Sequence, residues 1–528
     1  MNPDVTGPGR ADTRRRGGRN KITVALVGLV AAGLALSACA GQTNPTGDAT
    51  QAGGGTLTLI QGSVPLSLDP AKSNAGQASQ YVDLAYSNLI HWNGDAEFVP
   101  ELAESFEFVG EGNTTFQIDL RDDVKFSDGT PLDAAAVKTY LEYFQTANGP
   151  FGATAANLIE SIETPAADTV VVHFSAPNPD APLAFAEGGF WGSIVNPSIL
   201  ADDPEALGTT TAGAGPYMLD TAATVTGSSY VYVKNPEYFD AASQKWDKVE
   251  VKVIANANSA LQAVTTGKNT WAQGTWQQVD AAASAGLQVE DSVPNVYSLF
   301  LIDRDGELQP ALGEEKVRQA LNYAIDRDAF ASLLNGAANQ QIIAEGYPGY
   351  SEEAASVYTY DPDKATQLLA EAGYPEGFTF SVLVGTFDPY TSQVAQALAD
   401  QFADVGVTME ISTAATFPDF AREQGTLQYS ADVEAWGSTT MYGVAQQLVL
   451  PAGVVNPWHS SDDELNALYE KASGQVGDEA LATWEQLSLA VTEKAWYVPV
   501  ATVGSPFFAT AGLNVLGDSA GYPNPLYF

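Results

Sequence analysis

Strand and helix patterns intermix along the chain from residue 56 onward, and this alternation restricts the possible fold more than any other feature. Segments in which every second residue is apolar predict strands with one buried face. These segments are TLTLI (56–60), TFQIDL (115–120), TVVVHF (169–174), SYVYVK (229–234), KVEVKVI (248–254), FTFSVLV (378–384) and VTMEIS (407–412). Helical spacing occurs between them, so the sequence predicts an α/β protein.

The helix signals include both apolar faces and end caps. In DPDKATQLLAEAGY, Asp361 suits the N-cap and Gly373 suits a left-handed residue after the last turn. Apolar residues share one helical face from Val137 to Phe144 and again from Val317 to Ile325. The strand–helix–strand order across 361–412 predicts an α/β unit.

The length of the chain requires more than one core. A single hydrophobic core stops growing at roughly 250–300 residues, so 528 residues predict two or three lobes. No repeat with a period of about 20 to 50 residues is visible, which argues against solenoids and propellers.

The first residues have the pattern of an export signal. Residues 10–21 contain six Arg or Lys, and the uncharged run ITVALVGLVAAGLAL (22–36) follows them. This run is shorter than the roughly 20 residues that span a bilayer, and no second long apolar run follows. We therefore expect export and no membrane-spanning segment.

Cys39 is the single cysteine, and it follows Leu-Ser-Ala (36–38), which resembles the lipobox of bacterial lipoproteins. In that family the thiol is acylated and the chain is cut before it. We expect a lipoprotein signal peptide at 1–38 and a lipidated Cys39 with a flexible, Gly-rich tether at 39–54, which together hold the protein on the outer side of the cell membrane. The alternative is an ordinary buried cysteine.

Charge excludes one class of partner. Six of the 23 basic and two of the 64 acidic residues lie in the first 38 positions, which leaves 17 basic and 62 acidic residues. Because such a surface repels phosphate backbones, we expect no nucleic acid partner.

Catalytic and metal motifs are absent from the sequence. The three histidines, His91, His173 and His459, lie far apart, and there is no HExxH, CxxC or GxSxG. DRDGE (303–307) departs from the EF-hand pattern and predicts a turn. We therefore expect no metal, no cofactor and no enzymatic activity, although chance carboxylate pairs leave a glycosidase open.

Six longer segments, in this order, resemble one family. They are SLDPAKSN (67–74), FQIDLRDDVKFSDGTPLDAAAVKTYLEYF (116–144), GAGPYML (213–219), VKNPEYFD (233–240), EEKVRQALNYAIDRDAF (314–330) and YDPDKATQLLAEAGYPEGF (360–378). They are similar to the family 5 extracellular solute-binding proteins, the peptide, nickel and oligosaccharide receptors of ATP-binding-cassette importers. The resemblance covers 55–528, and most of these motifs are expected to be architectural.

The resemblance implies a type II-like periplasmic-binding fold, in which two lobes are joined by hinge strands. The implied ranges are 55–92, 210–300 and 497–528 for lobe I, 93–209 for a subdomain inserted in lobe I, and 301–496 for lobe II. A monomer would close on a small solute in the cleft between the lobes and deliver it to the importer's permease subunits, and the lipid would be its one membrane contact.

The resemblance also implies ligand-binding residues from several segments. The first lobe would offer Asn74, Ala75 and Gly76, and the hinge region would offer Gln273, Gly274 and Thr275. Trp276 is a further candidate, although Trp271 and Trp276 can each face the core or the cleft.

In the second lobe, Asp388 and Tyr390 follow the strand at 378–384, at the usual ligand edge of an α/β sheet. Phe387 lies in the same loop. Trp436 and Gly437 match the family segment that precedes the main ligand anchors, and Arg422 matches a position near a bound carboxylate in some peptide receptors, or is an ordinary surface arginine.

One departure from the family pattern concerns the anchor of a ligand's α-amino group. Peptide receptors commonly have an aspartate three residues after the tryptophan that corresponds to Trp436, whereas this chain has Thr439 there. Since a hydroxyl carries no charge, Asp388 or Glu434 would have to replace it. No histidine lies in these segments, which argues against nickel.

A peptide-like ligand is the first expectation. An oligosaccharide is the second, because Trp276, Trp436, Tyr390 and Tyr442 would suit stacking on sugars. A secreted glycosidase and a signalling receptor remain alternatives.

Overall fold

The computed structural model describes residues 54–73, 78–93, 97–150, 152–292, 294–388, 390–437 and 439–513. Within these ranges no helix combines the length and the apolar character needed to cross a bilayer. The predicted signal peptide, Cys39 and nearly all of the tether lie outside the described residues.

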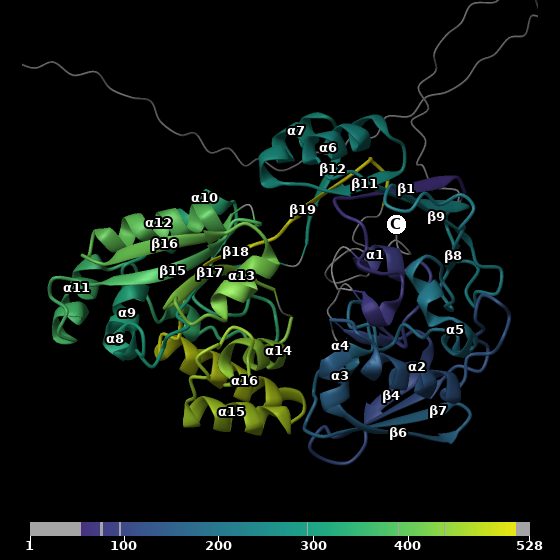
Figure 1. The fold of residues 1–528 in the computed structure, drawn as a ribbon, viewed down its shortest axis with the longest axis horizontal. Helices are drawn as coiled ribbons and strands as arrows, with labels where there is room; N and C mark the ends of the chain where they lie inside the picture. The colour runs from purple at the N-terminus through teal and green to yellow at the C-terminus, as the bar shows by residue number, and fades with distance from the viewer. Residues whose placement is uncertain are drawn as a thin grey trace, which may run out of the picture. The chain divides into compact units, whose positions relative to one another are not determined.

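The first sheet has seven strands and contains both the first and the last strands of the described chain (Figure 1). Its order is β12 (Gln288–Asp291), β19 (Pro506–Ala509), β11 (Thr270–Gln273), β1 (Thr56–Gln61), β10 (Lys248–Val253), β9 (Ser229–Lys234) and β8 (Tyr217–Leu219). The strand β1 is parallel to both neighbours, with Leu59 opposite Val251 on β10 and Trp271 on β11. Helices α6 (Ala257–Thr266) and α7 (Val279–Ser284) pack on this sheet through Ala260 and Ala282.

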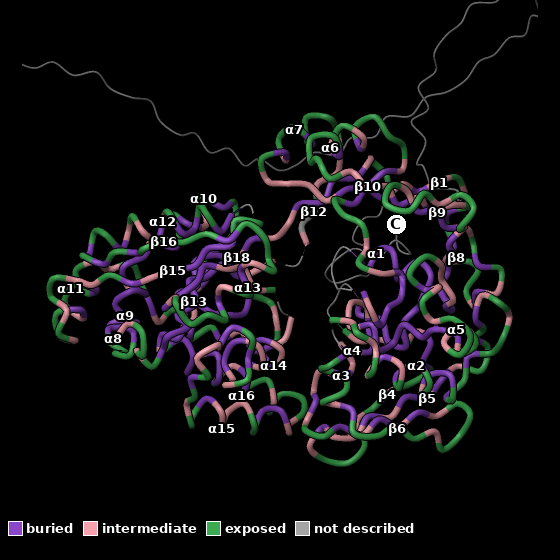
Figure 2. Tube along the Cα trace, viewed as in Figure 1, coloured by how far each residue is buried: buried purple, intermediate pink, exposed green. Residues whose placement is uncertain are grey.

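A second, four-stranded antiparallel sheet lies between β1 and β8 in the sequence. Its order is β4 (Ala103–Phe108), β5 (Thr115–Leu120), β7 (Thr169–Phe174) and β6 (Ile159–Ala166). Helix α2 (Ala134–Thr146) begins where the Asp133 carboxylate accepts a hydrogen bond from the Ala136 amide, and it buries its apolar face against this sheet. Side chains of this sheet and of the seven-stranded sheet share one hydrophobic cluster, so together they form one lobe. Figure 2 marks the buried positions along the chain in purple.

The six-stranded sheet forms the second lobe. Its order is β14 (Ala337–Ala338), β18 (Tyr497–Val503), β13 (Asn295–Phe300), β17 (Ala431–Trp436), β15 (Thr379–Gly385) and β16 (Thr408–Ala414). Five helices share one cluster with one face of this sheet, namely α8 (Pro310–Gly313), α9 (Glu315–Tyr323), α10 (Arg327–Leu334), α11 (Pro362–Glu371) and α12 (Thr391–Ala403). A different cluster joins Phe300 of β13 to α14 (Met441–Val444), α15 (Asp463–Ser473) and α16 (Gly477–Glu493).

Two chain segments connect the lobes, and they contact each other. One runs from β12 to β13 and the other from β18 to β19, and we call them the crossing segments. The Ser292 amide donates to the Ser505 carbonyl at 2.9 Å, and the Ser505 amide donates to the Ser292 hydroxyl at 2.8 Å. The two crossing segments are thereby tied to each other as they pass between the lobes.

The expected lobe I ranges 210–300 and 497–528 include β13 and β18, but both strands hydrogen-bond within the six-stranded sheet. The crossing segments therefore lie at 292–294 and 504–505. Alternating apolar residues predict that a segment is a strand, but they do not predict which sheet it joins.

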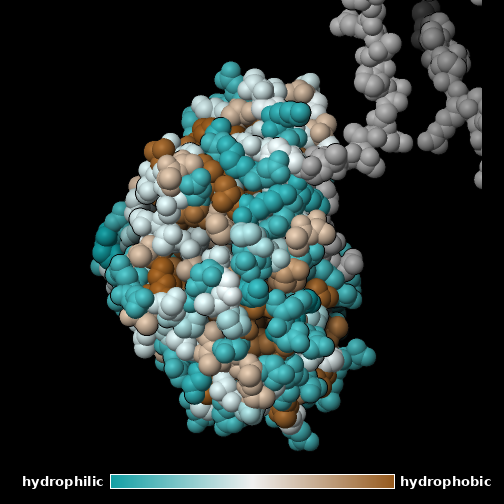
Figure 3. Space-filling model, turned by 90° about the vertical axis from the view of Figure 1, so that its right-hand side faces the viewer, coloured by the Kyte–Doolittle hydropathy of each residue, from teal (hydrophilic) through white to brown (hydrophobic). Residues whose placement is uncertain are grey.

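On the face that Figure 3 shows, hydrophilic side chains dominate and the apolar ones gather in small separate groups. This is the ordinary surface of a globular protein.

Candidate ligand-binding site

The predicted residues from the hinge region begin at the end of β11. Trp271 is fully buried and packs against Phe507 with ring centroids 4.9 Å apart, so it belongs to the core of the first lobe. Gln273 pairs with Phe507 in the β11–β19 ladder. The Gly274 amide donates to the Pro506 carbonyl at 2.7 Å, and a Cβ at Gly274 would lie 2.0 Å from the Phe508 ring. Close packing against β19 therefore requires glycine here.

Trp276 lies where the two lobes meet. Thr275 and Gln278 form a capping box that starts the short helix Trp276–Gln278. The Trp276 indole donates to the carbonyl of Gly504, in the second crossing segment, at 2.8 Å. Its ring packs against the core of the second lobe, in the cluster that includes Tyr390. Trp276 thus joins both lobes, unlike Trp271.

The loop after β15 is held by Asp388. One carboxylate oxygen accepts from the amides of Tyr390 at 2.8 Å and Thr391 at 3.1 Å, and the other accepts from the Tyr297 hydroxyl at 3.0 Å. Burial, followed by the nearby charge of Asp388, raises the pKa of Tyr297, which stays a neutral donor. The structure therefore brings Asp388, Tyr390 and Trp276 together, and it uses Asp388 to start α12.

An exposed aromatic pair lies beside this loop. Phe387 is 44% exposed, and Phe417, at the start of α13 (Phe417–Gln424), is 59% exposed. Their rings meet edge to face with centroids 5.8 Å apart, above the buried ring of Phe420. Phe417 is not among the residues predicted from the sequence, although an aromatic residue shortly after a predicted strand was the available signal.

The end of β17 lies beside the first crossing segment. Trp436 is opposite Val296 in the β13–β17 ladder, and its partly buried ring packs against the cluster around α14 and α16. Gly437 is exposed, and a Cβ there would lie 2.2 Å from the Asn295 side-chain oxygen. Thr439 is partly exposed, as a ligand contact requires.

Glu434 belongs to a buried polar cluster in the second lobe. The Gln424 side-chain amide donates to Asp432 at 2.7 Å and to Glu434 at 3.2 Å. Burial raises the pKa of Asp432 to about 7, and burial together with the charge of Asp432 raises the pKa of Glu434 well above its usual range. Glu434 is therefore committed to this cluster, which argues against a role as an ammonium anchor.

Arg422 lies on the surface. Its side chain is 63% exposed and forms ion pairs with Asp419 at 2.6 Å and Glu423 at 3.3 Å. The hydrogen bond that Arg422 donates to the Asp419 carboxylate raises the pKa of Arg422. Both partners lie in its own helix, α13.

Asn74, Ala75 and Gly76, the ligand contacts predicted in the first lobe, lie outside the described residues. In the described part of the chain, no group of three His, Cys, Asp or Glu side chains is arranged to hold a metal ion.

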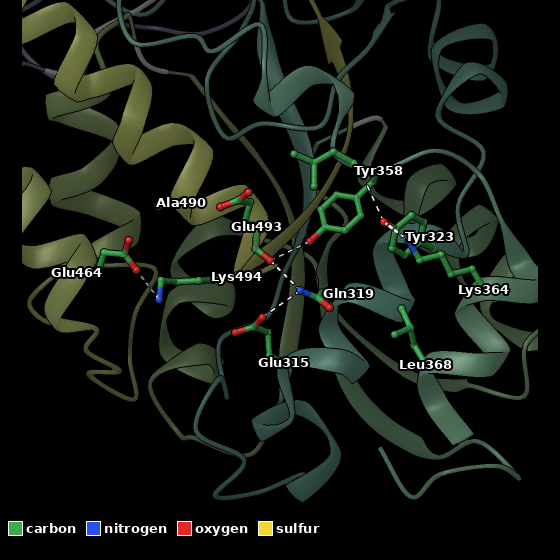
Figure 4. Close-up of a pocket in the computed structure, with 11 residues that line it drawn as sticks. Glu315, Gln319, Tyr323, Tyr358, Lys364, Leu368, Glu464, Ala490, Glu493 and Lys494 are labelled. Atoms are coloured by element: carbon green, nitrogen blue, oxygen red, sulfur yellow. Dashed lines mark hydrogen bonds and ion pairs between the residues drawn. The ribbon is translucent and has the colours of Figure 1, made fainter. Parts of the chain in front are cut away.

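A cavity of about 610 Å³ lies in the second lobe, and its lining in the described part of the chain includes none of the predicted site residues (Figure 4). Its polar side chains pair with each other or with nearby groups. Lys494 contacts Glu464 at 3.1 Å and Asp462 at 2.9 Å, Gln319 donates to Glu315 at 3.0 Å, and Lys364 donates to the Tyr323 hydroxyl at 2.7 Å. Because these groups are already satisfied, the cavity does not call for a polar ligand.

Comparison with known proteins finds one family model and relatives that match most of the chain. The family model for bacterial extracellular solute-binding proteins, family 5 (middle region), matches residues 97–450. The chain is 28% identical over 395 residues to the glutathione-binding protein GsiB of Pectobacterium atrosepticum, which covers 73% of this chain and 72% of that protein.

Two solved structures show a similar fold. HbpA2 of Haemophilus parasuis superposes with a TM-score of 0.76 at 21% identity, over 89% of this chain and 98% of that chain. The ABC transporter-associated periplasmic binding protein DppA of Helicobacter pylori, in complex with the peptide STSA, superposes with a TM-score of 0.71 at 20% identity, over 90% and 98%.

Proposed function

The chain belongs to the bacterial extracellular solute-binding proteins of family 5, and from this membership we propose that it captures a small peptide-like solute between its two lobes. Proteins of this family bind solutes for ATP-binding-cassette importers and are not enzymes, so the glycosidase alternative is dropped. The captured solute passes to the permease subunits of the importer.

The packing of Trp276 against the second-lobe cluster that includes Tyr390 is the single observation that supports this site most directly. It joins the first lobe to the second lobe next to the crossing segments. A ligand in contact with both rings touches both lobes, and it stabilises the closed arrangement through its higher affinity for that state. Thr439, Gly437 and Trp436 supply further contacts at the end of β17.

A peptide-like ligand is supported by the named ligands of two relatives, glutathione for GsiB and the peptide STSA for DppA. An oligosaccharide is the second candidate, favoured by the rings of Trp276, Trp436 and Tyr390. Since Asp388 and Glu434 are both engaged elsewhere, the ligand's amino group would be held by neutral acceptors such as Thr439.

The proposal includes a membrane anchor. The lipobox at Cys39 supports a lipid anchor on the outer face of the membrane, joined to the folded body through residues 40–53. Radiolabelled palmitate should label the full chain in cells, and Cys39→Ala should abolish the label and release the protein from the membrane fraction. Label on the Cys39→Ala chain would contradict the anchor.

The ligand proposal is tested with residues 40–528, which contain every described residue. We expect peptides, including glutathione, to raise the melting temperature and to be recovered unchanged, because binding to the folded state alone stabilises it. Tyr390→Phe should weaken this shift, whereas Tyr360→Phe, at a site 51% exposed in the second lobe, should not. A shift with cello- or xylo-oligosaccharides and none with peptides would replace the first candidate by the second.

A further inference from the structure

The two lobes also touch at a place separate from the crossing segments. The Asn113 side-chain amide donates to the carbonyls of Ser473 and Gln475, both at 2.8 Å. The Thr440 hydroxyl donates to the Asp180 carboxylate at 2.5 Å, and the Tyr442 hydroxyl donates to the Pro177 carbonyl at 3.1 Å. Each of these hydrogen bonds joins a loop around the four-stranded sheet to the helices α14 and α15.

Both sides of this contact are built into the fold. Asn113 is 3% exposed in a left-handed conformation, with φ of 53°, and its carbonyl accepts from the Asn178 amide at 2.9 Å. The two loops of the first lobe are thereby tied together. On the other side, the Thr440 hydroxyl also accepts from the Gly443 amide at 3.1 Å and starts α14.

The contact lies away from the crossing segments. Tyr442 stacks on Tyr469 of α15 with centroids 5.6 Å apart, and it belongs to the cluster of Phe300 and Ile302. Phe300 is the last residue of β13, whereas the crossing segment enters that strand at Asn295. The lobes are therefore joined covalently through the crossing segments and, at a separate place, by these hydrogen bonds.

We infer that these hydrogen bonds form a latch, which holds the two lobes closed in the absence of ligand. The closed state becomes more favourable as the pH falls. The latch residues are Asn113, Pro177 and Asp180 in the first lobe and Thr440, Tyr442, Ser473 and Gln475 in the second.

The acid dependence follows from the surroundings of Asp180. Thr440 donates the one side-chain hydrogen bond that the structure gives to this carboxylate. Among the described residues, the titratable groups that face Asp180 are the phenols of Tyr442 and Tyr469, and burial raises the pKa of both, so that they stay neutral. Burial raises the pKa of Asp180 to about 6.

The direction of the effect follows by linkage. When the lobes separate, Asp180 returns to water, where a carboxyl of this kind titrates near pH ~3.9. Between these two values the closed state binds a proton that the open state releases, so closure becomes more favourable as the pH falls through 6. The closed-to-open ratio should rise by about tenfold between pH 8 and pH 5.

The test measures lobe separation without ligand. Residues 40–528 contain no cysteine, so Glu142→Cys on α2 and Glu470→Cys on α15, both exposed, give two unique spin-label sites. Electron–electron double resonance should show short distances gaining population from pH 8 to pH 5. The same distances at both pH values would overturn the acid dependence.

Three variants make the assignment specific. Asp180→Asn keeps the acceptor without the charge, so it should be closed at both pH values. Asn113→Gly keeps the left-handed backbone but removes the amide, so it should open the lobes at both pH values and retain the pH response. Asp202→Asn, at an exposed site on the same lobe, should behave as wild type.

An unchanged pH response in Asp180→Asn, or unchanged distances in Asn113→Gly, would overturn the latch. The inference concerns the closure that the proposed function uses, but no ligand takes part in this measurement. Failure to bind peptides would therefore leave the latch standing, and failure of the latch would leave the ligand proposal standing.

Discussion

At the scale of single residues, several buried polar atoms beside β17 lack a hydrogen-bond partner among the described residues, and they belong to Arg304, Asp432 and Ser298. The Arg304 guanidinium lies 4.4 Å from the centre of the Trp496 ring and donates to the Tyr497 hydroxyl at 2.9 Å. Two of its nitrogens, one oxygen of Asp432 and the Ser298 hydroxyl are buried without a hydrogen-bond partner in the described structure. Such atoms destabilise a core unless water or a proton satisfies them.

We predict that Glu434→Gln makes stability less dependent on pH. The pKa values of Asp432 and Glu434 are raised by burial, so the folded state holds protons that the unfolded state releases above pH ~4. This contribution to stability is complete below the unfolded pKa and is lost as the pH rises through about 7. Each proton involved contributes a slope of at most about 1.4 kcal/mol per pH unit.

Urea unfolding at pH 5, 6, 7 and 8 measures this slope. Glu434→Gln removes one of the two carboxyls and should be more stable than wild type at pH 8. Glu410→Gln, at an exposed site on β16, is the matched control and should follow the wild-type curve. If the free energy of unfolding depended on pH equally in wild type and Glu434→Gln, the prediction would be wrong, because Glu434 would then contribute nothing to that dependence.

At the scale of elements, Asp388 decides how α12 starts and how it attaches to the sheet. Its carboxylate binds two amides at the helix start and the Tyr297 hydroxyl of β13. We predict that Asp388→Ala lowers the free energy of unfolding by about 1–2 kcal/mol, the usual effect of losing a cap. Asp388→Asn keeps an oxygen acceptor, so it should retain most of the stability and all of the ligand response.

Chemical unfolding and ligand thermal shifts, measured on both variants, separate the two roles of Asp388. Asp363→Ala, at an exposed position in the first turn of α11, serves as the control and should change stability little. Loss of the ligand shift in a stable Asp388→Asn protein would instead assign the carboxylate to the ligand.

The elements themselves were largely predictable. All seven alternating segments are strands, and Asp361 caps α11 by accepting from the Lys364 amide at 2.9 Å. These features depend on local periodicity and turn chemistry, which neighbouring residues determine. Strand partners depend on contacts between residues far apart in the sequence. The sheet to which β13 and β18 belong was therefore not predictable.

The site was predictable only in part, for the same reason. Trp276 and Trp271 are equivalent candidates in the sequence, and only the path of β11 separates the core residue from the one that joins the lobes. Phe417 and Asp180 come from segments without a motif, and they matter because of what the fold places beside them.

At the scale of the whole molecule, the predicted α/β fold class and the predicted family are confirmed. The excess of acidic residues lowers the stability of the folded state through repulsion between like charges. With 62 acidic and 17 basic residues after position 38, most carboxylates have no basic partner, and the compact state brings these like charges together.

We predict that sodium chloride stabilises residues 40–528 at pH 8. Raising the salt from about 20 to 300 mM shortens the screening distance from roughly 20 Å to below 10 Å, which weakens repulsion between distant carboxylates. Exposed ion pairs such as Lys316 with Glu371, at 2.9 Å, also weaken, but each contributes only about 0–1 kcal/mol. Because repulsion involves many more groups than the ion pairs do, the melting temperature should rise with salt. A falling melting temperature would mean that the ion pairs outweigh the repulsion, and a repeat at pH 4.5, where more carboxyls are protonated, should show a smaller salt effect.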